Sequence, residues 1–348
     1  MHFLENMDAV AADDAEAVTY ECEVSCYSQM VGQFEYGPYS LMLWEFSDKP
    51  DGQERKLCLR VKSVKHRGLS KRRKNAYYHG GWIPDELIAL SCLFLRRKLK
   101  LGRVVRMNDK PHMGGNAPAP IDPQLLAGKS RLSDLRCWFE HMERLSPRYH
   151  LKFMLAVRLY HRAVMEMEDN PDFAYLNLVS AIEALCGDTK IDEVPLCKLS
   201  ATLGKLVDSI EPESLRLKVG EAILKREKHI SRRFVQFILD HVEASFWQES
   251  TVPSQAYRIK REDLPEYVKR VYNQRSKLLH EGKPFPPMVF MPNVDNSEID
   301  NISAGMGVGK KEWTPKEYIP YPSFFERLVN HVLRSYLKRH LGGKPRKR

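Results

Sequence analysis

The character of the C-terminal part of the chain is decided by the stretch Leu264-Pro-Glu-Tyr-Val-Lys-Arg-Val-Tyr-Asn-Gln-Arg-Ser-Lys-Leu-Leu-His-Glu-Gly282. Its apolar residues recur with the i, i+3, i+4, i+7 spacing of an amphipathic helix. They are Leu264, Tyr267, Val268, Val271, Leu278 and Leu279. One turn after Val271 the same stripe reaches Arg275. An isolated buried charge is costly, so Arg275 needs a carboxylate, an anionic ligand or a wet cleft.

His280 lies in the last turn of this predicted helix, because Gly282 supplies a left-handed residue that ends it and Pro284 prevents its continuation. A helix C-terminus favours imidazolium, which tunes a histidine toward proton transfer near neutral pH. Five residues correspond to about 140° on an ideal helix, so Arg275 and His280 share no face. They converge only if the last turn loosens or if a second molecule completes the site.

The string Arg275-x4-His280-Glu-Gly resembles the R-x4–6-H signature of HEPN domains, small helical domains named for nucleotide binding in higher eukaryotes and prokaryotes. The helix predicted over 176–187 is similar to the Ala-x-Glu-x-Leu helix that precedes this signature in the Apea-like branch. One face of it carries Tyr175, Leu178, Val179, Ile182, Leu185 and Cys186, with Glu183 at the edge. Glu183 is therefore the candidate partner of Arg275. The resemblance covers roughly residues 145–348.

This resemblance implies an endoribonuclease that acts without metal or cofactor, as a homodimer whose protomers form one composite cleft. Arg275 would stabilise the phosphate charge and His280 would serve as acid or base while the 2′-hydroxyl of the RNA attacks its own phosphate. Ser276 stands where many members have Asn or Asp, and it keeps a hydroxyl. Gly282 stands where members of two-gene toxin–antitoxin systems often carry Tyr, which argues against that kind of system. The expected role is an antiviral defence or stress effector controlled by the N-terminal module.

Length and composition describe a globular protein large enough for two domains. The 348 residues are 43% hydrophobic and 29% charged. No apolar run approaches 18 residues and the first residues lack a signal-peptide pattern, so neither a membrane span nor secretion is predicted. The seven cysteines are scattered, which fits free thiols in a reducing cytoplasm. Cys22 and Cys26 have no second Cys or His pair at a finger-like distance, so no metal site is predicted.

Charge is distributed very unevenly. Residues 1–54 contain twelve acidic residues against one Lys, and residues 55–106 contain sixteen basic residues against two acidic ones. The basic stripe could hold the phosphate backbone of RNA. The candidate RNA-binding residues are Lys71, Arg72, Arg73, Lys74, Arg96, Arg97 and Lys98. The alternative is a solvated surface that the acidic N-terminal segment partly neutralises.

The predicted fold is α+β overall. A small N-terminal α/β module of unknown type over residues 1–107 has strands at 39–46 and 56–64 and a helix at 86–99. Residues 108–131 read as a linker or long loop because they are rich in proline and glycine. Residues 132–348 read as a mainly helical HEPN-like domain. One long helix is expected to end near Trp247, and the last helix to begin with a capping box of Ser323 and Glu326.

Two functions of different classes follow from these patterns. The first is a dimeric, metal-independent endoribonuclease acting on RNA at Arg275, His280, Glu183 and Ser276. The second is a non-catalytic helical module that binds nucleic acid or a protein partner. In that case Arg275 and Glu183 form a structural ion pair between helices.

Overall fold

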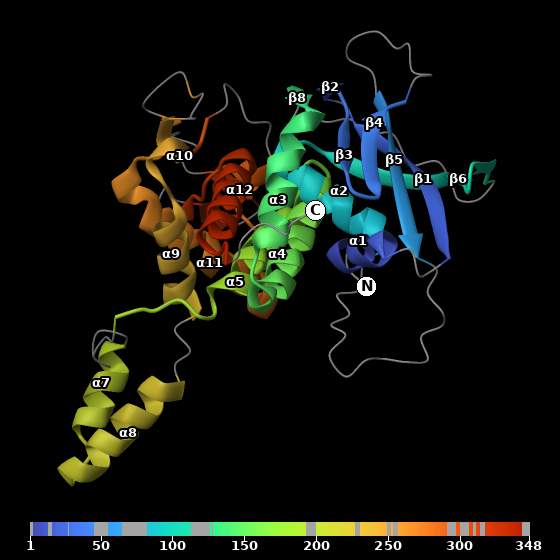
Figure 1. The fold of residues 1–348 in the computed structure, drawn as a ribbon. Helices are drawn as coiled ribbons and strands as arrows, with labels where there is room; N and C mark the ends of the chain where they lie inside the picture. The colour runs from blue at the N-terminus through green and yellow to red at the C-terminus, as the bar shows by residue number, and fades with distance from the viewer. Residues whose placement is uncertain are drawn as a thin grey trace.

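A computed structural model describes residues 3–12, 16–26, 28–44, 55–64, 82–112, 126, 128–192, 200–226, 230–248, 252, 257–290, 297–299, 306–308, 311–313 and 317–342. The fold is α+β, as predicted: an antiparallel sheet near the N-terminus is followed by a mostly helical region (Figure 1). Helix α1 (Phe3–Ala11) precedes the sheet and packs against it. Its Asn6 is fully buried and donates to the hydroxyl of Tyr39 at 2.9 Å.

The main sheet has six strands in the order β3-β4-β5-β1-β6-β7, and all of its pairs are antiparallel. A separate parallel pair joins β2 to β8, at the end of the segment predicted as a linker. The strands are β1 (Ala17–Cys26), β2 (Gln29–Val31), β3 (Phe34–Tyr36), β4 (Tyr39–Leu43), β5 (Arg55–Val64), β6 (Leu99–Met107), β7 (Lys110–Pro111), β8 (Lys129–Arg131), β9 (Met306–Val308) and β10 (Lys311–Trp313). The strand predicted at 56–64 is confirmed as β5.

Strand β1 lies in the middle of the main sheet, between β5 and β6, and was not among the predicted strands. Cys22, Val24 and Cys26 are fully buried and alternate with Glu21 and Glu23. The two glutamates interrupt the apolar pattern of the sequence. Because a strand places successive side chains on opposite faces, they do not lie on the face of β1 that carries the buried cysteines and valine. The period-2 signal was therefore present but weak.

The glutamates of β1 meet the basic residues of its two neighbouring strands. The ion pairs are Glu21–Arg60, Glu21–Arg106, Glu23–Lys56 and Glu23–Arg103. Cross-strand pairs of opposite charge stabilise a sheet modestly. In this part of the chain the acidic segment thus neutralises the basic one across the sheet, in agreement with the second of the two interpretations of the charge pattern.

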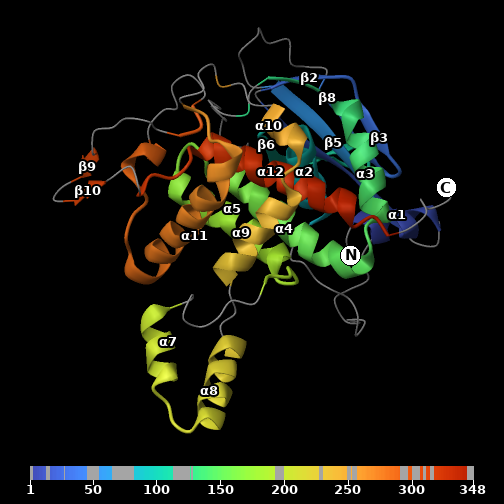
Figure 2. The ribbon, with the colours of Figure 1, turned by 90° about the vertical axis from the view of Figure 1, so that its left-hand side faces the viewer.

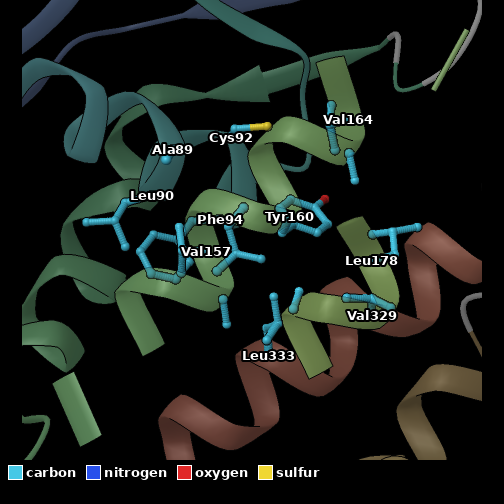
Figure 3. Packing of buried hydrophobic residues seen from close by; sticks show 14 of the residues in the cluster. Ala89, Leu90, Cys92, Phe94, Val157, Tyr160, Val164, Leu178, Val329 and Leu333 are labelled. Carbon is cyan, nitrogen blue, oxygen red and sulfur yellow. The ribbon is translucent and has the colours of Figure 1, made fainter. Parts of the chain in front are cut away.

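Helix α2 (Ile83–Leu95) joins the sheet to the helical region. Every residue in it except Asp85 is buried, as expected for a helix that is apolar on all sides. It contacts β6 and β5 on one side and α4 (Pro147–Glu166) on the other. Figure 3 shows Leu90 and Phe94 of α2 in one cluster with Val157 of α4. The sheet and the helices therefore share one continuous core.

The remaining helices form a bundle beside the sheet, and Figures 1 and 2 both show α7 and α8 standing away from it. The bounds are α3 (Leu135–Arg144), α5 (Pro171–Cys186), α7 (Ala201–Asp208), α8 (Glu213–Arg226), α9 (Ile230–His241), α10 (Ala244–Gln248), α11 (Leu264–Glu281) and α12 (Pro322–Arg339). Several helices begin with proline at the first or second position, where its missing N–H costs nothing. These prolines are Pro84, Pro147, Pro171, Pro265 and Pro322.

Two predicted helix ends are wrong. The helix expected to reach residue 99 ends at Leu95, because Arg96 adopts a left-handed conformation (φ 52°) and the chain turns back into β6. The helix expected to end near Trp247 stops at His241, and a short helix, α10, follows. Apolar periodicity continued across both breaks, so it could not reveal them.

The predicted capping box at the start of α12 is also wrong. Glu326 is fully buried and points into the core. Its carboxylate accepts two hydrogen bonds from Nε of Arg96 (3.2 and 3.0 Å), one from Nη2 of Arg96 (2.6 Å) and one from the hydroxyl of Tyr160 (2.5 Å). Asn330, one turn later, donates to Tyr160 at 3.0 Å and to the carbonyl of Leu93 at 2.8 Å. This network ties α2, α4 and α12 together.

His241 is a buried core residue, as its place on an apolar stripe predicts. Its Nδ1–H donates to the carbonyl of Phe237 at 2.8 Å, and its Nε2 is buried with no hydrogen bond inside the described ranges. Burial lowers the pKa of His241, and the positive charges of Arg339 and His340 act in the same direction. The folded protein therefore holds this imidazole neutral.

Acid is expected to destabilise the protein through His241. The unfolded chain binds a proton near pH 6.5, whereas the folded chain binds it only at lower pH, so the free energy of unfolding falls as pH drops below about 6.5. Urea unfolding at several pH values should show a shallower decline for His241→Phe than for the wild type. The exposed His112 provides the control: a decline that His112→Ala and His241→Phe alter equally would contradict this assignment.

Among the helices of the described ranges, none combines the length and the apolar character that a membrane crossing requires.

Candidate functional site

The proposed Arg275–Glu183 pair exists and joins α11 to α5. Nη2 of Arg275 donates to Oε2 of Glu183 at 2.9 Å, and the two side chains are 20% and 21% exposed. Both helices also bury apolar residues completely: Val268 and Val271 in α11, and Leu178 and Ile182 in α5. The apolar stripes of both helices thus bring the guanidinium and the carboxylate together at the rim of the core.

Tyr272 completes the surroundings of this pair. Its ring packs against Phe234 of α9 at 5.1 Å, and the guanidinium carbon of Arg275 lies 6.0 Å from its centroid. Burial and the nearby Glu183, to which its hydroxyl is hydrogen-bonded, raise the pKa of Tyr272. Nε of Arg275 is buried and makes no hydrogen bond within the residues described. The ion pair therefore engages one edge of the guanidinium and leaves part of its donor capacity unused.

His280 occupies the last turn of α11 and is exposed, whereas Arg275 faces α5. Gly282 caps the helix in the left-handed conformation (φ 65°), and its N–H donates to the carbonyl of Leu278 at 3.1 Å, as predicted. Ser276 is half-buried beside Arg275. The apolar spacing predicts that Leu279 lies on the buried stripe, and this is wrong because its side chain is 52% exposed. Within one chain, Arg275 thus faces a neighbouring helix, whereas His280 faces solvent.

The three described members of the predicted RNA-binding stripe lie in internal contacts. Arg96 is held by Glu326, and Lys98 donates to Glu168 at 2.5 Å with only 8% of its side chain exposed. Arg97 donates to the backbone carbonyls of Arg96 and Lys129. Because all three side chains are held by internal partners, they are weak candidates for RNA contacts. The other members, Lys71, Arg72, Arg73 and Lys74, lie outside the described residues.

Two cations that the sequence patterns did not single out contact the chain just after α5, the helix that carries Glu183. Arg233 of α9 donates to the carbonyl of Gly187, the residue that follows α5, at 3.2 Å. Arg232 donates to the carbonyl of Asp192 at 2.8 Å. They lie in the helical sequence Ser-Arg-Arg-Phe234, which matches no motif that would have identified them. Packing of α9 on α5 and α11 places them here.

Comparison with protein-family models, with curated proteins and with solved structures finds no match to this chain. In the part of the chain that is described, no three His, Cys, Asp or Glu side chains gather as a metal site would require, and the cysteines are all free.

Proposed function

We propose that this protein is a HEPN-type endoribonuclease that cleaves RNA without a metal ion. The observation that supports it most is the Arg275–Glu183 pair, about one-fifth exposed between two packed helices, with His280 exposed one turn further on. A guanidinium is permanently charged and matches the geometry of a phosphate. Its carboxylate partner fixes its position before the substrate arrives, which is the preorganisation that electrostatic catalysis needs.

The proposed reaction is an internal transfer at one phosphodiester. The 2′-hydroxyl oxygen forms a bond to the neighbouring phosphorus as its proton leaves to a base, and the bond to the 5′ oxygen breaks as that oxygen takes up a proton. The products are a 2′,3′-cyclic phosphate and a 5′-hydroxyl end. Arg275 would bind the anionic phosphate oxygens in the transition state, and His280 would transfer one of the two protons. Ser276 would contribute a hydroxyl beside Arg275.

The functional unit in this proposal is a homodimer. Because Arg275 faces α5 while His280 is exposed on another side of α11, a second protomer is the simplest source of the missing half of the cleft. Arg232 and Arg233 would extend the positive surface toward the RNA. We place the enzyme in the cytoplasm, as a defence or stress effector that the N-terminal sheet region regulates.

The test is incubation of purified full-length protein with mixed RNA in excess EDTA, followed by analysis of the product ends. Wild-type protein should leave cyclic phosphate ends. His280→Ala should lower the cleavage rate by about 10²- to 10⁴-fold, because a positioned acid or base contributes that much. His112→Ala, which removes another exposed histidine, should cleave like the wild type. Equal rates in all three proteins would exclude His280 from the reaction.

The alternative is a non-catalytic helical module that binds nucleic acid or a partner. The direct contact between Arg275 and Glu183 supports this alternative if the ion pair serves to hold two helices together. The same experiment separates the two functions. Folded wild-type protein that binds RNA but leaves it intact, with or without added divalent metal, would support the binding module.

A further inference from the structure

Tyr272 and Arg275 of α11 bind the same carboxylate. Glu183 of α5 accepts a hydrogen bond from Nη2 of Arg275 at 2.9 Å and another from the hydroxyl of Tyr272. Residues three apart on a helix lie about 60° from each other around its axis, so both donors reach α5 from one side of α11. Glu183 is therefore held by two side chains from neighbouring turns of α11.

A second tyrosine–arginine pair on α11 has the same spacing but uses its arginine differently. Tyr267 precedes Arg270 by three residues, and the guanidinium carbon of Arg270 lies 5.1 Å from the ring centroid of Tyr267. Arg270 donates from its Nε to Glu266 at 3.2 Å. Nε of Arg275, in contrast, is buried and has no hydrogen-bond partner in the described part of the chain. Arg275 thus binds its carboxylate through a terminal nitrogen and not through Nε.

A buried N–H without a partner, close to a carboxylate, needs a physical reason. Arginine and a carboxylate favour a fork of two parallel N–H···O bonds, and an unpaired buried donor is costly. Glu183 would form such a fork by turning toward both Nε and Nη2 of Arg275. The hydroxyl of Tyr272 opposes this turn, because the carboxylate would have to give up its second donor. Burial and the charge of Glu183 raise the pKa of Tyr272, so this hydroxyl stays protonated and remains a donor.

The ring that carries this hydroxyl is fixed by the core. It packs against Phe234 of α9, which is fully buried, with ring centroids 5.1 Å apart. The preceding residue, Val271, is also fully buried, so this turn of α11 is anchored on the bundle. A tyrosine whose ring is packed in this way directs its hydroxyl to one place. The contact with Glu183 is therefore set by the packing of α9, α5 and α11 together.

We propose that Tyr272 is a positioning residue whose hydroxyl keeps Glu183 from closing a fork on Arg275, so that the guanidinium keeps N–H groups available to a phosphate of the RNA. The consequence for cleavage rests on the proposed ribonuclease function, whereas the geometry does not. An arginine that is fully paired with a carboxylate has fewer donors to offer an anion. Loss of the hydroxyl should therefore slow cleavage while the packing of the ring is retained.

The geometry is tested by NMR of the full-length protein labelled with ¹⁵N-arginine. The Nε–H signal of Arg275 is assigned by its disappearance in Arg275→Lys. Tyr272→Phe keeps the ring but removes the hydroxyl, and it should move this signal downfield in the proton dimension because the Nε–H gains a hydrogen bond to Glu183. Tyr267→Phe is the matched control, since it removes a hydroxyl from the same helix beside another arginine, and it should leave the signal in place.

The consequence is measured as RNA cleavage in EDTA. Tyr272→Phe should lower kcat by about tenfold or more with little change in KM, because a misplaced group weakens binding of the transition state. Tyr267→Phe should cleave like the wild type. In a Glu183→Ala background, Tyr272→Phe should have no further effect, since the hydroxyl acts through that carboxylate. A tyrosine with a merely structural role would lower the midpoint of thermal unfolding and leave the kcat of the folded fraction unchanged.

The two measurements separate this inference from the proposed function. Wild-type protein that leaves RNA intact contradicts the ribonuclease, while the NMR signal still decides whether Tyr272 holds the pair open. An unshifted Nε–H signal in Tyr272→Phe overturns the inference even if the wild type cleaves RNA. So does an equal loss of kcat from Tyr272→Phe in the wild-type and Glu183→Ala backgrounds, because the hydroxyl would then act on another group.

Discussion

Replacement of Glu326 by alanine is expected to lower the free energy of unfolding by about 3–5 kcal/mol, the cost of breaking a buried ion pair by removing one partner. Glu326 is fully buried in α12, and its carboxylate is the acceptor for both Arg96 and Tyr160. Its loss leaves the guanidinium of Arg96 beside the core without its carboxylate.

The size of this effect follows from the position of the network. Arg96 ends α2, Tyr160 lies in α4 and Glu326 lies in α12. One carboxylate therefore connects α2, which packs against the sheet, with two helices of the bundle. Burial and the negative charge of Glu326 raise the pKa of Tyr160, which keeps its hydroxyl protonated as a donor. Removal of the carboxylate therefore takes an acceptor from two donors at once.

Urea unfolding monitored by circular dichroism measures the change. Glu266→Ala is the matched control, because it removes the carboxylate of an exposed i, i+4 pair with Arg270 and should cost less than about 1 kcal/mol. The double variant Arg96→Met with Glu326→Leu should be more stable than Glu326→Ala, since no uncompensated charge remains. A Glu326→Ala protein as stable as the Glu266→Ala protein would show that the network contributes little.

Replacement of Arg275 by alanine is expected to lower the rate of RNA cleavage in EDTA by about 10²- to 10³-fold, the usual cost of removing one group that stabilises transition-state charge. Arg275→Lys should recover only part of the rate, because an ammonium keeps the charge but lacks the planar fork. Glu183→Gln should reduce the rate less than Arg275→Ala, since it loosens the guanidinium without removing it.

Arg270→Ala provides a closely matched control for Arg275→Ala. Arg270 lies in the same helix, pairs with Glu266 at 3.2 Å and has its guanidinium carbon 5.1 Å from the ring centroid of Tyr267. Cleavage rates are compared between proteins with equal midpoints of thermal unfolding, so that a smaller folded fraction is not mistaken for a slower reaction. If Arg270→Ala reduces cleavage as much as Arg275→Ala, the Arg275 effect is structural and the proposed role is wrong.

Much of the candidate site was predictable from local patterns. Helical periodicity placed Arg275 toward a neighbouring helix and Glu183 at the edge of another apolar face, and the two side chains do meet at 2.9 Å. The left-handed Gly282 was equally predictable, because glycine adopts positive φ readily. The neighbouring Arg233 was not, since its contact with Gly187 depends on how α9 crosses the bundle.

Periodicity and composition were enough to establish the α+β class, the strand at β5 and the inward face of α11, because each depends on the spacing of residues within one element. They could not show which cations face solvent. Arg96 and Lys98 look like surface residues in a basic run, yet their partners, Glu326 and Glu168, lie far along the chain. Whether a charged side chain faces solvent or the protein interior is decided only when distant elements pack, and that packing gave Arg96, Arg97 and Lys98 internal partners.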